Sequence, residues 1–374
     1  MIKVGVDLTD LKYAQTGQKT YLESIAKEFK ELNDQAFEFH FFASPFPNFK
    51  SKNIFLILTN HFLLQCWKQI ILPIQLNLKK CDIIFCTDYY VPLLHINFKS
   101  VQVIHDTFFF EYPNHYNKHW MLIYKTFSLP ATYKSSFIIA PTNYSKIQIN
   151  KKLNIPIQKI VTISEGPKIF DSTQSSSHFL EIKHIIPESP YFLHVGVFEK
   201  RKNLLFLLKA FHAFKIKGHI NYKLILVGKG TGRVESDDSK NIMNLIADLQ
   251  LQNDVILTGY LSENLLKQVY QKAFAYIFPS YNEGFGIPTL EAFQFDLPVL
   301  VANNSCLPEV GGDAVLTFDP YNQNDLLEKM ELICAEPAIR FSLIKKGRER
   351  LKLFTWQNTA KELLAVFKRT INTN

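Results

Sequence analysis

The sequence predicts an α/β protein made of two doubly wound domains. The chain has 374 residues, more than one typical domain needs. Short apolar runs alternate with segments of helical periodicity, which is typical of parallel sheets covered by helices. This alternation stops in residues 165–190, a stretch with a serine-rich run (DSTQSSS, 171–177) and three prolines, and then starts again.

The first series predicts a domain over residues 1–168, followed by a linker over 169–190. A helix is expected at 20–32, and a second, amphipathic helix at 61–80 is expected to be interrupted at Pro73. The expected strands are IKVGVDL (2–8), FEFHFFA (37–43), CDIIFC (81–86), VQVIHD (101–106), SFIIAP (136–141) and IVTIS (160–164).

The second series predicts a domain over residues 191–353. Its helices are expected to start at Asn203, Ser239, Ser262 and Ile287. Its expected strands are YFLHVG (191–196), KLILVG (223–228), DVILTG (254–259), AYIFPS (275–280) and LPVLVA (297–302). A terminal amphipathic helix, 354–374, is expected to pack back on the first domain. Because open α/β sheets bind ligands at the carboxyl ends of their strands, we expect a site in the cleft between the domains.

Charge is unevenly distributed between the two halves. Residues 1–168 contain 19 Lys, no Arg and 12 acidic residues, a net charge of +7. The remaining residues contain 23 basic and 22 acidic residues, a net charge of +1. The basic half could attract an acidic substrate or an anionic membrane, and a solvated lysine-rich surface explains it equally well. No nucleic-acid-binding motif accompanies it, so we expect no nucleic acid partner.

Cysteine usage and hydropathy predict a cytoplasmic protein. The five cysteines are odd in number and form no CxxC pair, which fits a reducing compartment. No apolar run approaches the roughly 20 residues that span a bilayer. Peripheral association with the inner face of the membrane remains compatible with the sequence, because the helix around Trp67 could rest on anionic lipid or be buried. The residues that suggest lipid contact are Leu63, Leu64, Ile70 and Ile71, with Lys68, Lys79 and Lys80.

The segment YNEGFGIPTLEAF (281–293) carries two glutamates beside an anion-binding turn. It follows an expected strand and opens a helix, with Pro288 suited to the first turn. The backbone N–H groups of residues 284–287 lie at a helix N-terminus, where anions bind. Glu283 and Glu291 can accept hydrogen bonds from hydroxyl groups, so the segment suits a nucleotide sugar. The spacing alone is common, and by itself it is more often a capping or surface ion-pair arrangement.

A second polar turn, in HVGVFEKRKNLLF (194–206), also follows an expected strand. Gly196 is followed by Arg201 and Lys202, whose cations could hold a diphosphate or form a solvated basic turn. His105 and Asp106 end a strand of the first domain, where a histidine can contact a ligand or simply be half-buried. No His, Cys or Asp cluster has metal-ligand spacing, so we expect no metal and no other cofactor.

Together and in this order, these segments resemble the retaining glycosyltransferase family four. The resemblance covers most of the chain and is most specific from VILTGYL through PSYNEGFGIPTLEAF to LPEVGGDAVLTFDP (255–320). It implies the GT-B fold, in which two Rossmann-like doubly wound domains face each other across a cleft. It also implies metal-independent, retaining transfer of a hexose from a nucleotide diphosphate sugar.

The resemblance implies roles for individual residues. Catalytic roles fall on His105, Lys202 and Glu283: His105 near the reacting sugar, Lys202 with Arg201 on the leaving diphosphate, and Glu283 by the donor hexose. The other donor-binding residues it implies are Gly17, Gly196, Tyr260, Leu261, Gly284, Phe285, Gly286, Ile287 and Glu291, with Glu291 on the ribose and Tyr260 and Leu261 near the base. Glu309 occupies a family position without an assigned role. The chain departs from the family at Lys19, where a second glycine is usual, and at SEGP (164–167), which replaces the usual turn closing the first domain.

The predicted function is transfer of a hexose from a GDP- or UDP-sugar to a glycan or lipid-linked acceptor in cell-surface polysaccharide synthesis, as in a mannosyltransferase. An epimerase or phosphorylase of the same fold is an alternative enzyme. A degenerate transferase that binds a sugar nucleotide or a partner protein is the non-enzymatic alternative. The polar set Lys202, Glu283 and Glu291 favours the transferase over this last alternative.

Overall fold

The computed structural model describes residues 1–14, 17–49, 53–116, 118–170, 185–232 and 235–372. The chain divides into two compact units, which are described separately below. Unit 1 comprises Met1–Gly166 with Thr355–Asn374, and unit 2 comprises Pro167–Phe354. The predicted serine-rich linker segment 171–177 lies outside the described residues.

Unit 1 is built on a six-stranded parallel sheet with the order β2-β1-β3-β4-β5-β6. Its central strands are buried on both faces, which explains why they are read in the sequence as continuous apolar runs. Strand order reverses between β1 and β3, which pair directly, Val4 opposite Ile83. The strands are β1 (Ile2–Asp7), β2 (Phe37–Phe42), β3 (Ile83–Cys86), β4 (Lys99–Val103), β5 (Phe137–Ala140) and β6 (Ile160–Thr162).

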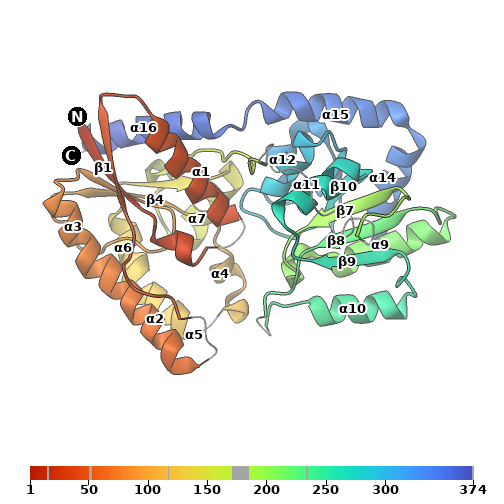
Figure 1. The fold of residues 1–374 in the computed structure, drawn as a ribbon, viewed down its shortest axis with the longest axis horizontal. Coiled ribbons are helices and arrows are strands. Elements are labelled where there is room, and N and C mark those ends of the chain that lie inside the picture. Colours follow the sequence, from red (N-terminus) through yellow and green to blue (C-terminus); the bar gives the residue numbers. More distant parts are fainter. Residues whose placement is uncertain (15–16, 50–52, 117, 171–184, 233–234, 373–374) are drawn as a thin grey trace. The chain divides into compact units, whose positions relative to one another are not determined.

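The last helix of the chain packs into the core of unit 1. Trp356, Leu363 and Phe367 of α16 share a buried cluster with β1, β3 and β4 (Figure 1). The indole of Trp356 also covers Gly166, where a Cβ would lie 2.8 Å from the ring. The helices of unit 1 are α1 (Gly17–Glu31), α2 (Ile54–Cys66), α3 (Leu72–Leu78), α4 (Phe108–Glu111), α5 (Lys118–Ile123), α6 (Leu129–Lys134), α7 (Asn143–Leu153) and α16 (Trp356–Asn372).

The helical segment predicted at 61–80 differs from expectation. It begins earlier, at Ile54, and is not interrupted at Pro73, since α2 continues through a π-helical turn (Trp67–Ile71) into α3. In that turn the Leu72 amide donates to the carbonyl of Trp67, five residues back. Pro73 then falls in the first turn of α3, where a missing N–H costs little.

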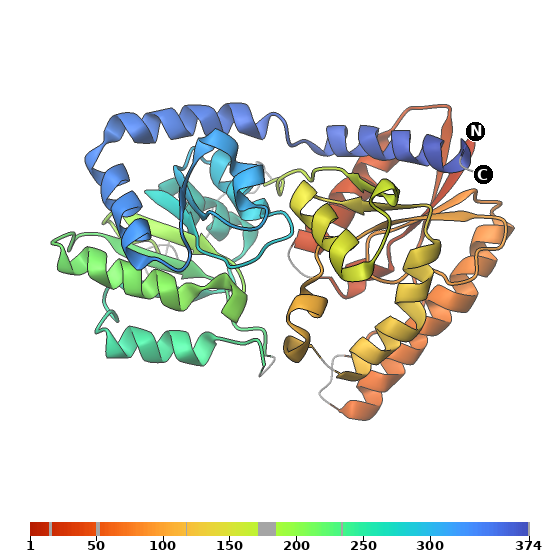
Figure 2. The same cartoon turned by 180° about the vertical axis from the view of Figure 1, so that it is seen from behind.

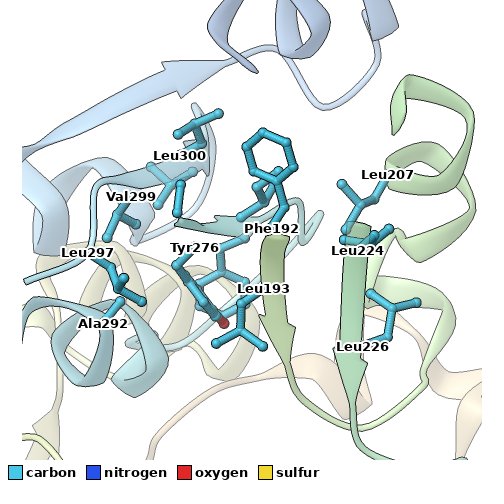
Figure 3. Close-up of a cluster of buried hydrophobic side chains, with 14 of the residues drawn as sticks. Phe192, Leu193, Leu207, Leu224, Leu226, Tyr276, Ala292, Leu297, Val299 and Leu300 are labelled. Carbon is cyan, nitrogen blue, oxygen red and sulfur yellow. The ribbon is translucent and has the colours of Figure 1, made fainter. Parts of the chain in front are cut away.

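Unit 2 is built on a second six-stranded parallel sheet, with the order β12-β11-β10-β7-β8-β9. This is the 3-2-1-4-5-6 arrangement of a dinucleotide-binding fold, with the order reversing between β7 and β10. Figure 3 shows side chains of β7, β8, β10 and β11 gathered in its core. The strands are β7 (Tyr191–Val195), β8 (Lys223–Val227), β9 (Val255–Gly259), β10 (Ala275–Phe278), β11 (Val299–Ala302) and β12 (Val315–Phe318).

Helices flank the sheet of unit 2 (Figure 2). The four helix starts predicted from sequence agree with the structure within one residue, and Ser262 caps α11 by accepting from the Leu265 amide. The helices are α9 (Leu204–Ile216), α10 (Ser239–Asp248), α11 (Glu263–Lys272), α12 (Ile287–Gln294), α13 (Leu307–Gly311), α14 (Gln323–Ala335) and α15 (Pro337–Leu351).

Candidate functional site

The two polar turns predicted from sequence meet at the point where strand order reverses in unit 2. β7 and β10 are adjacent and parallel, so both of their carboxyl ends lie at the same edge of the sheet. Connections from these two strands diverge, and this is the position at which doubly wound sheets bind ligands. The turn after β7 and the loop after β10 are joined by a backbone hydrogen bond, from the Tyr281 amide to the Arg201 carbonyl (2.8 Å).

Glu283 lies between two cations at this edge of the sheet. Lys202 Nζ is 2.6 Å from Glu283 Oε1, and Arg201 Nη1 is 3.0 Å from Glu283 Oε2. Arg201 also donates to the carbonyl of Asn282 and pairs with Glu199 at 2.9 Å. Lys202 and Glu283 are both more than 90% buried, so their charges interact with little screening by water.

The pKa values follow from this geometry. Burial by itself would raise the pKa of Glu283, but Arg201 and Lys202 outweigh it and lower the pKa to about 2. Burial lowers the pKa of Lys202, and the Glu283 carboxylate opposes that change. Lys202 and Arg201 balance the charges of Glu283 and Glu199, so the two cations of this group are held in place by carboxylates.

Glycines bring the backbone close at the same edge. A Cβ on Gly228, which has a φ of +142°, would lie 1.9 Å from the carbonyl oxygen of Gly196. Gly286 adopts a left-handed conformation and precedes the first turn of α12. The side chains of Phe285 and Ile287 are buried beside it and hold the turn in place. The predicted anion-binding backbone of residues 284–287 therefore lies at the N-terminus of an eight-residue helix.

The second predicted carboxylate, Glu291, has a different environment. It lies within α12 and is buried, and its Oε2 accepts a 2.7 Å hydrogen bond from Tyr270 of α11. Burial raises its pKa, against the opposing effect of the Tyr270 hydroxyl. Neither capping nor an ion pair explains this residue. Because one hydroxyl group, that of Tyr270, binds the carboxyl group of Glu291, its oxygens can still accept hydrogen bonds from hydroxyl groups of a ligand.

Sequence reasoning missed His194, a buried histidine of β7. Its Nδ1 is 3.0 Å from the carbonyl of Ile277, so this nitrogen carries the proton. Burial lowers its pKa to about 4, which leaves the ring neutral. Nε2 has no hydrogen-bond partner within the described part of the chain, and it faces the backbone of Gly196 at 3.2 Å from a Cβ position there. In the sequence, His194 stands inside an apolar run and gives no sign of a role. Its polar environment becomes visible only when β7 is paired with β10.

Other predicted residues of unit 2 lie apart from this group. Tyr260 and Leu261 follow β9 at the edge of the sheet, two strands from β7. Tyr260 is 80% exposed, whereas Leu261 is buried in the core. Glu309 lies in α13, and its backbone carbonyl accepts a hydrogen bond from Arg350.

In unit 1, His105 follows β4 and is held by a carboxylate that the sequence did not single out. Its Nδ1 is 2.8 Å from Glu165 Oε1, and Glu165 is almost completely buried. Burial by itself would lower the pKa of His105, but Glu165, Asp106 and Asp10 outweigh it and raise the pKa above its usual value. Nε2 is buried and without a partner among the residues the structure describes, so it is available to a ligand.

The remaining predicted residues of unit 1 lie in the first turn of α1 and in the π-helical turn. Gly17 is the first residue of α1, and Lys19 forms a surface ion pair with Glu23 at 3.6 Å. Lys68, proposed from sequence as a membrane-facing cation, is buried and pairs with Asp7 (2.7 Å) and Asp88 (2.8 Å) at the carboxyl ends of β1 and β3. Lys68 therefore neutralises the strand ends of unit 1 and cannot contact lipid.

Comparison with known proteins shows which family the chain resembles. Residues 178–350, which contain the Lys202–Glu283 pair and Glu291, match the family described as glycosyl transferases group 1. The chain is similar to the group 1 glycosyltransferases over this part of its length. The predicted resemblance is thereby confirmed.

Two curated glycosyltransferases illustrate the similarity. O-antigen chain mannosyltransferase B of Escherichia coli is 28% identical over 284 residues, covering 75% of this chain and 72% of that protein. O-antigen chain mannosyltransferase RfbU of Salmonella typhimurium is 30% identical over 237 residues, covering 63% of this chain and 60% of that protein. The match spans only 27% of the length of the serotype-specific mannosyltransferase WbdA of Escherichia coli.

Solved glycosyltransferase structures confirm the predicted GT-B fold. Sucrose-phosphate synthase from Thermosynechococcus elongatus has a TM-score of 0.74 at 16% identity, with both chains fully covered. Alr3699/HepE of Anabaena, in complex with UDP and glucose, has a TM-score of 0.69 at 14% identity, covering 98% of this chain and 99% of that one. In the described parts of the present chain, no helix is both long and apolar enough to cross a membrane.

Proposed function

We propose that this protein is a group 1 glycosyltransferase that moves a hexose from a nucleotide diphosphate sugar to a glycan or lipid-linked acceptor in cell-surface polysaccharide synthesis. The observation that carries the proposal is the buried Lys202–Glu283–Arg201 group at the strand-order reversal of unit 2. A GDP- or UDP-linked hexose is the proposed donor. Mannose is the leading candidate for the hexose, because the curated relatives are named as O-antigen mannosyltransferases.

Lys202 and Arg201 are proposed to bind the diphosphate of the donor. Cleavage of the bond between the anomeric carbon and the phosphate oxygen builds negative charge on the leaving diphosphate. Fixed cations stabilise that charge more in the transition state than in the ground state, which lowers the barrier. Glu283 holds both cations in place beforehand, so less reorganisation is needed when the donor binds.

The buried carboxylates are proposed to orient the hydroxyl-rich parts of the donor. Glu291, fixed by Tyr270, would accept from the ribose hydroxyls, while Glu283 would lie by the hexose. The backbone of residues 284–287 would contact the phosphates and sugar, with further donor contacts from Gly17, Gly196, Tyr260 and Leu261. His105 would meet the reacting sugar through Nε2, the ring nitrogen that Glu165 leaves available.

The proposed reaction retains configuration and needs neither a metal nor another cofactor. The acceptor oxygen attacks the anomeric carbon from the face that the diphosphate leaves, and the acceptor proton passes to the leaving phosphate oxygen. The new glycosidic bond replaces the broken bond, and the free nucleoside diphosphate departs with the proton. The enzyme would work in the cytoplasm, with peripheral contact between unit 1 and the inner face of the membrane.

The first test is a donor panel. The pure full-length protein is incubated with UDP-, GDP-, ADP- and dTDP-sugars, and release of free nucleoside diphosphate is followed with and without acceptor glycans. Release from one donor, reduced by Lys202→Ala by at least roughly a hundredfold, is the expected result, since each ~1.4 kcal/mol of lost transition-state stabilisation is tenfold in rate. Arg340→Ala, a cation of unit 2 that stacks on Phe274, serves as the matched control.

Two outcomes decide against the proposal. Full activity in Lys202→Ala would remove this residue from the mechanism. Failure of every donor to bind, measured by calorimetry, would support the alternative of a degenerate transferase that binds a partner protein.

A further inference from the structure

One long helical segment of unit 1 carries an exposed apolar stripe. The segment comprises α2, the π-helical turn and α3, residues 54–78. Every exposed residue within 55–78 is a large hydrophobic, with Phe55 at 72% and Leu78 at 76% exposure. We call this set the apolar stripe; it consists of Phe55, Leu58, Phe62, Ile70, Ile74 and Leu78.

The spacing of the stripe places its members on one face. Successive members are three, four, eight, four and four residues apart, the neighbour spacings of a helix surface. The π-helical turn falls within the eight-residue interval and adds a residue to one turn, which keeps both halves of the stripe in phase. At about 1.5 Å per residue, the stripe is about 35 Å long.

Both the buried and the exposed side of this segment are apolar, unlike those of an ordinary surface helix: Trp67, Leu72 and Leu76 lie in a buried hydrophobic cluster. Trp67 and Lys68 point inward, and the Lys68 ion pairs anchor the π-helical turn to the ends of β1 and β3. Half-buried positions hold polar residues, such as Asn60 and Gln65, and apolar ones, such as Leu63 and Leu64. The inward apolar side chains already supply the packing within unit 1, so that packing does not explain the exposed apolar face.

The chain segment that carries the stripe contains no acidic residue. Residues 39–81 contain no Asp or Glu and have four Lys besides the buried Lys68; two of these, Lys79 and Lys80, follow the stripe directly and are exposed. Residues 112–164, which include α5 and α6, also contain no Asp or Glu and have seven Lys. A long apolar face on a lysine-rich segment without acidic residues is the combination that binds anionic lipid.

We propose that the apolar stripe lies flat in the interface of an anionic lipid surface, with the surrounding lysines on the head groups. A second copy of the chain fits the same face less well. A two-fold contact sets each surface against itself, so lysine-rich regions would repel one another. The proposal rests on the proposed function, which includes contact between unit 1 and the membrane, and it names the surface that makes this contact and its reason, access to a lipid-linked acceptor.

The test measures vesicle binding of the full-length protein. Sedimentation with vesicles of phosphatidylcholine containing phosphatidylglycerol is compared with pure phosphatidylcholine. The triple variant Phe62→Gln, Ile74→Gln, Leu78→Gln is expected to lose affinity for the mixed vesicles at least roughly tenfold, because three apolar side chains no longer enter the interface. The stripe residues are exposed, so the melting temperature should be preserved.

A matched control separates the stripe from exposed apolar side chains in general. The variant Ile216→Gln, Ile220→Gln, Phe341→Gln removes three equally exposed hydrophobics from unit 2 and is expected to bind vesicles like the wild type. Equal binding by the stripe variant and the wild type would overturn the proposal. A second outcome would also overturn it: the wild type is a dimer that does not bind vesicles, and the stripe variant is a monomer. That result would assign the stripe to self-association.

Two further measurements distinguish failure of this proposal from failure of the proposed function. Donor turnover without vesicles should be unchanged in the stripe variant. Conversely, Lys202→Ala should lose donor turnover and still bind vesicles. If the protein binds vesicles but binds and turns over no donor of the panel, the proposal for the stripe is supported and the transferase proposal is refuted.

Discussion

Glu283 is expected to be a major contributor to the stability of unit 2, and Glu283→Gln tests this. The substitution keeps the shape of the side chain but removes the charge that Lys202 and Arg201 share. Lys202 would then be a buried cation without its partner, and its pKa would fall further. Breaking a buried ion pair from one side typically costs about 3–5 kcal/mol.

The pKa of Glu283 supports a similar magnitude. It falls from an ordinary 4.5 to about 2 on folding. At about 1.4 kcal/mol per pKa unit, this corresponds to roughly 3 kcal/mol of folding free energy. Because the folded pKa is the lower one, this stabilisation is fully present above pH 4.5 and disappears as the pH falls towards 2.

The assay must report on unit 2 alone. All three tryptophans, at positions 67, 120 and 356, belong to unit 1, so tryptophan fluorescence does not follow unit 2. Native-state hydrogen exchange of peptides from β7 and β10, read by mass spectrometry in increasing urea, provides the free energy of unfolding of unit 2. We expect a loss of about 3 kcal/mol in Glu283→Gln, equal at pH 6, 7 and 8.

Glu199→Gln is the matched control. Glu199 pairs with the same Arg201 but is twice as exposed as Glu283 and does not pair with Lys202. Its loss should therefore cost less than about 1 kcal/mol. A loss below about 1 kcal/mol in Glu283→Gln as well, or a difference that varies between pH 6 and 8, would refute the reasoning.

Three further predictions address other contacts. Glu165→Gln should lower the pKa of His105 measured by NMR, because the carboxylate that offsets burial is gone; an unchanged pKa would show that Glu165 does not act on the imidazole. Tyr270→Phe should cost unit 2 about 1–2 kcal/mol in the exchange assay, since Glu291 is left buried without this donor, and a neutral effect would argue that the hydrogen bond is dispensable. Gly228→Ala should cost about 3 kcal/mol or more because its Cβ would overlap a backbone carbonyl, and equal stability would contradict this geometry.

Much of the fold was predictable because it is encoded locally. Buried parallel strands are read as short continuous apolar runs, and the five runs of the second series became β7 to β11. Capping residues and prolines in the sequence predicted where helices start to within one residue, as at Ser262 and Ile287. β12 was not predicted as a strand: it lies at the sheet edge, and two of its four residues, Leu316 and Thr317, are not buried. The π-helical turn escaped because nothing in the sequence marks a single extra residue per turn.

The sequence by itself determined the polar residues at the strand ends, since Lys202, Glu283 and His105 each follow an apolar run and carry chemistry that a loop does not need. It could not determine their partners. Which strand lies beside which is decided by packing, and only the pairing of β7 with β10 brings Lys202 to Glu283 across 81 residues of sequence. The same limit applies to Trp67 and Lys68, whose inward orientation depends on one π-helical turn. Helical spacing shows which residues share a face, but it does not show which face the core will cover. Tertiary structure therefore decided which apolar face of that helix is exposed.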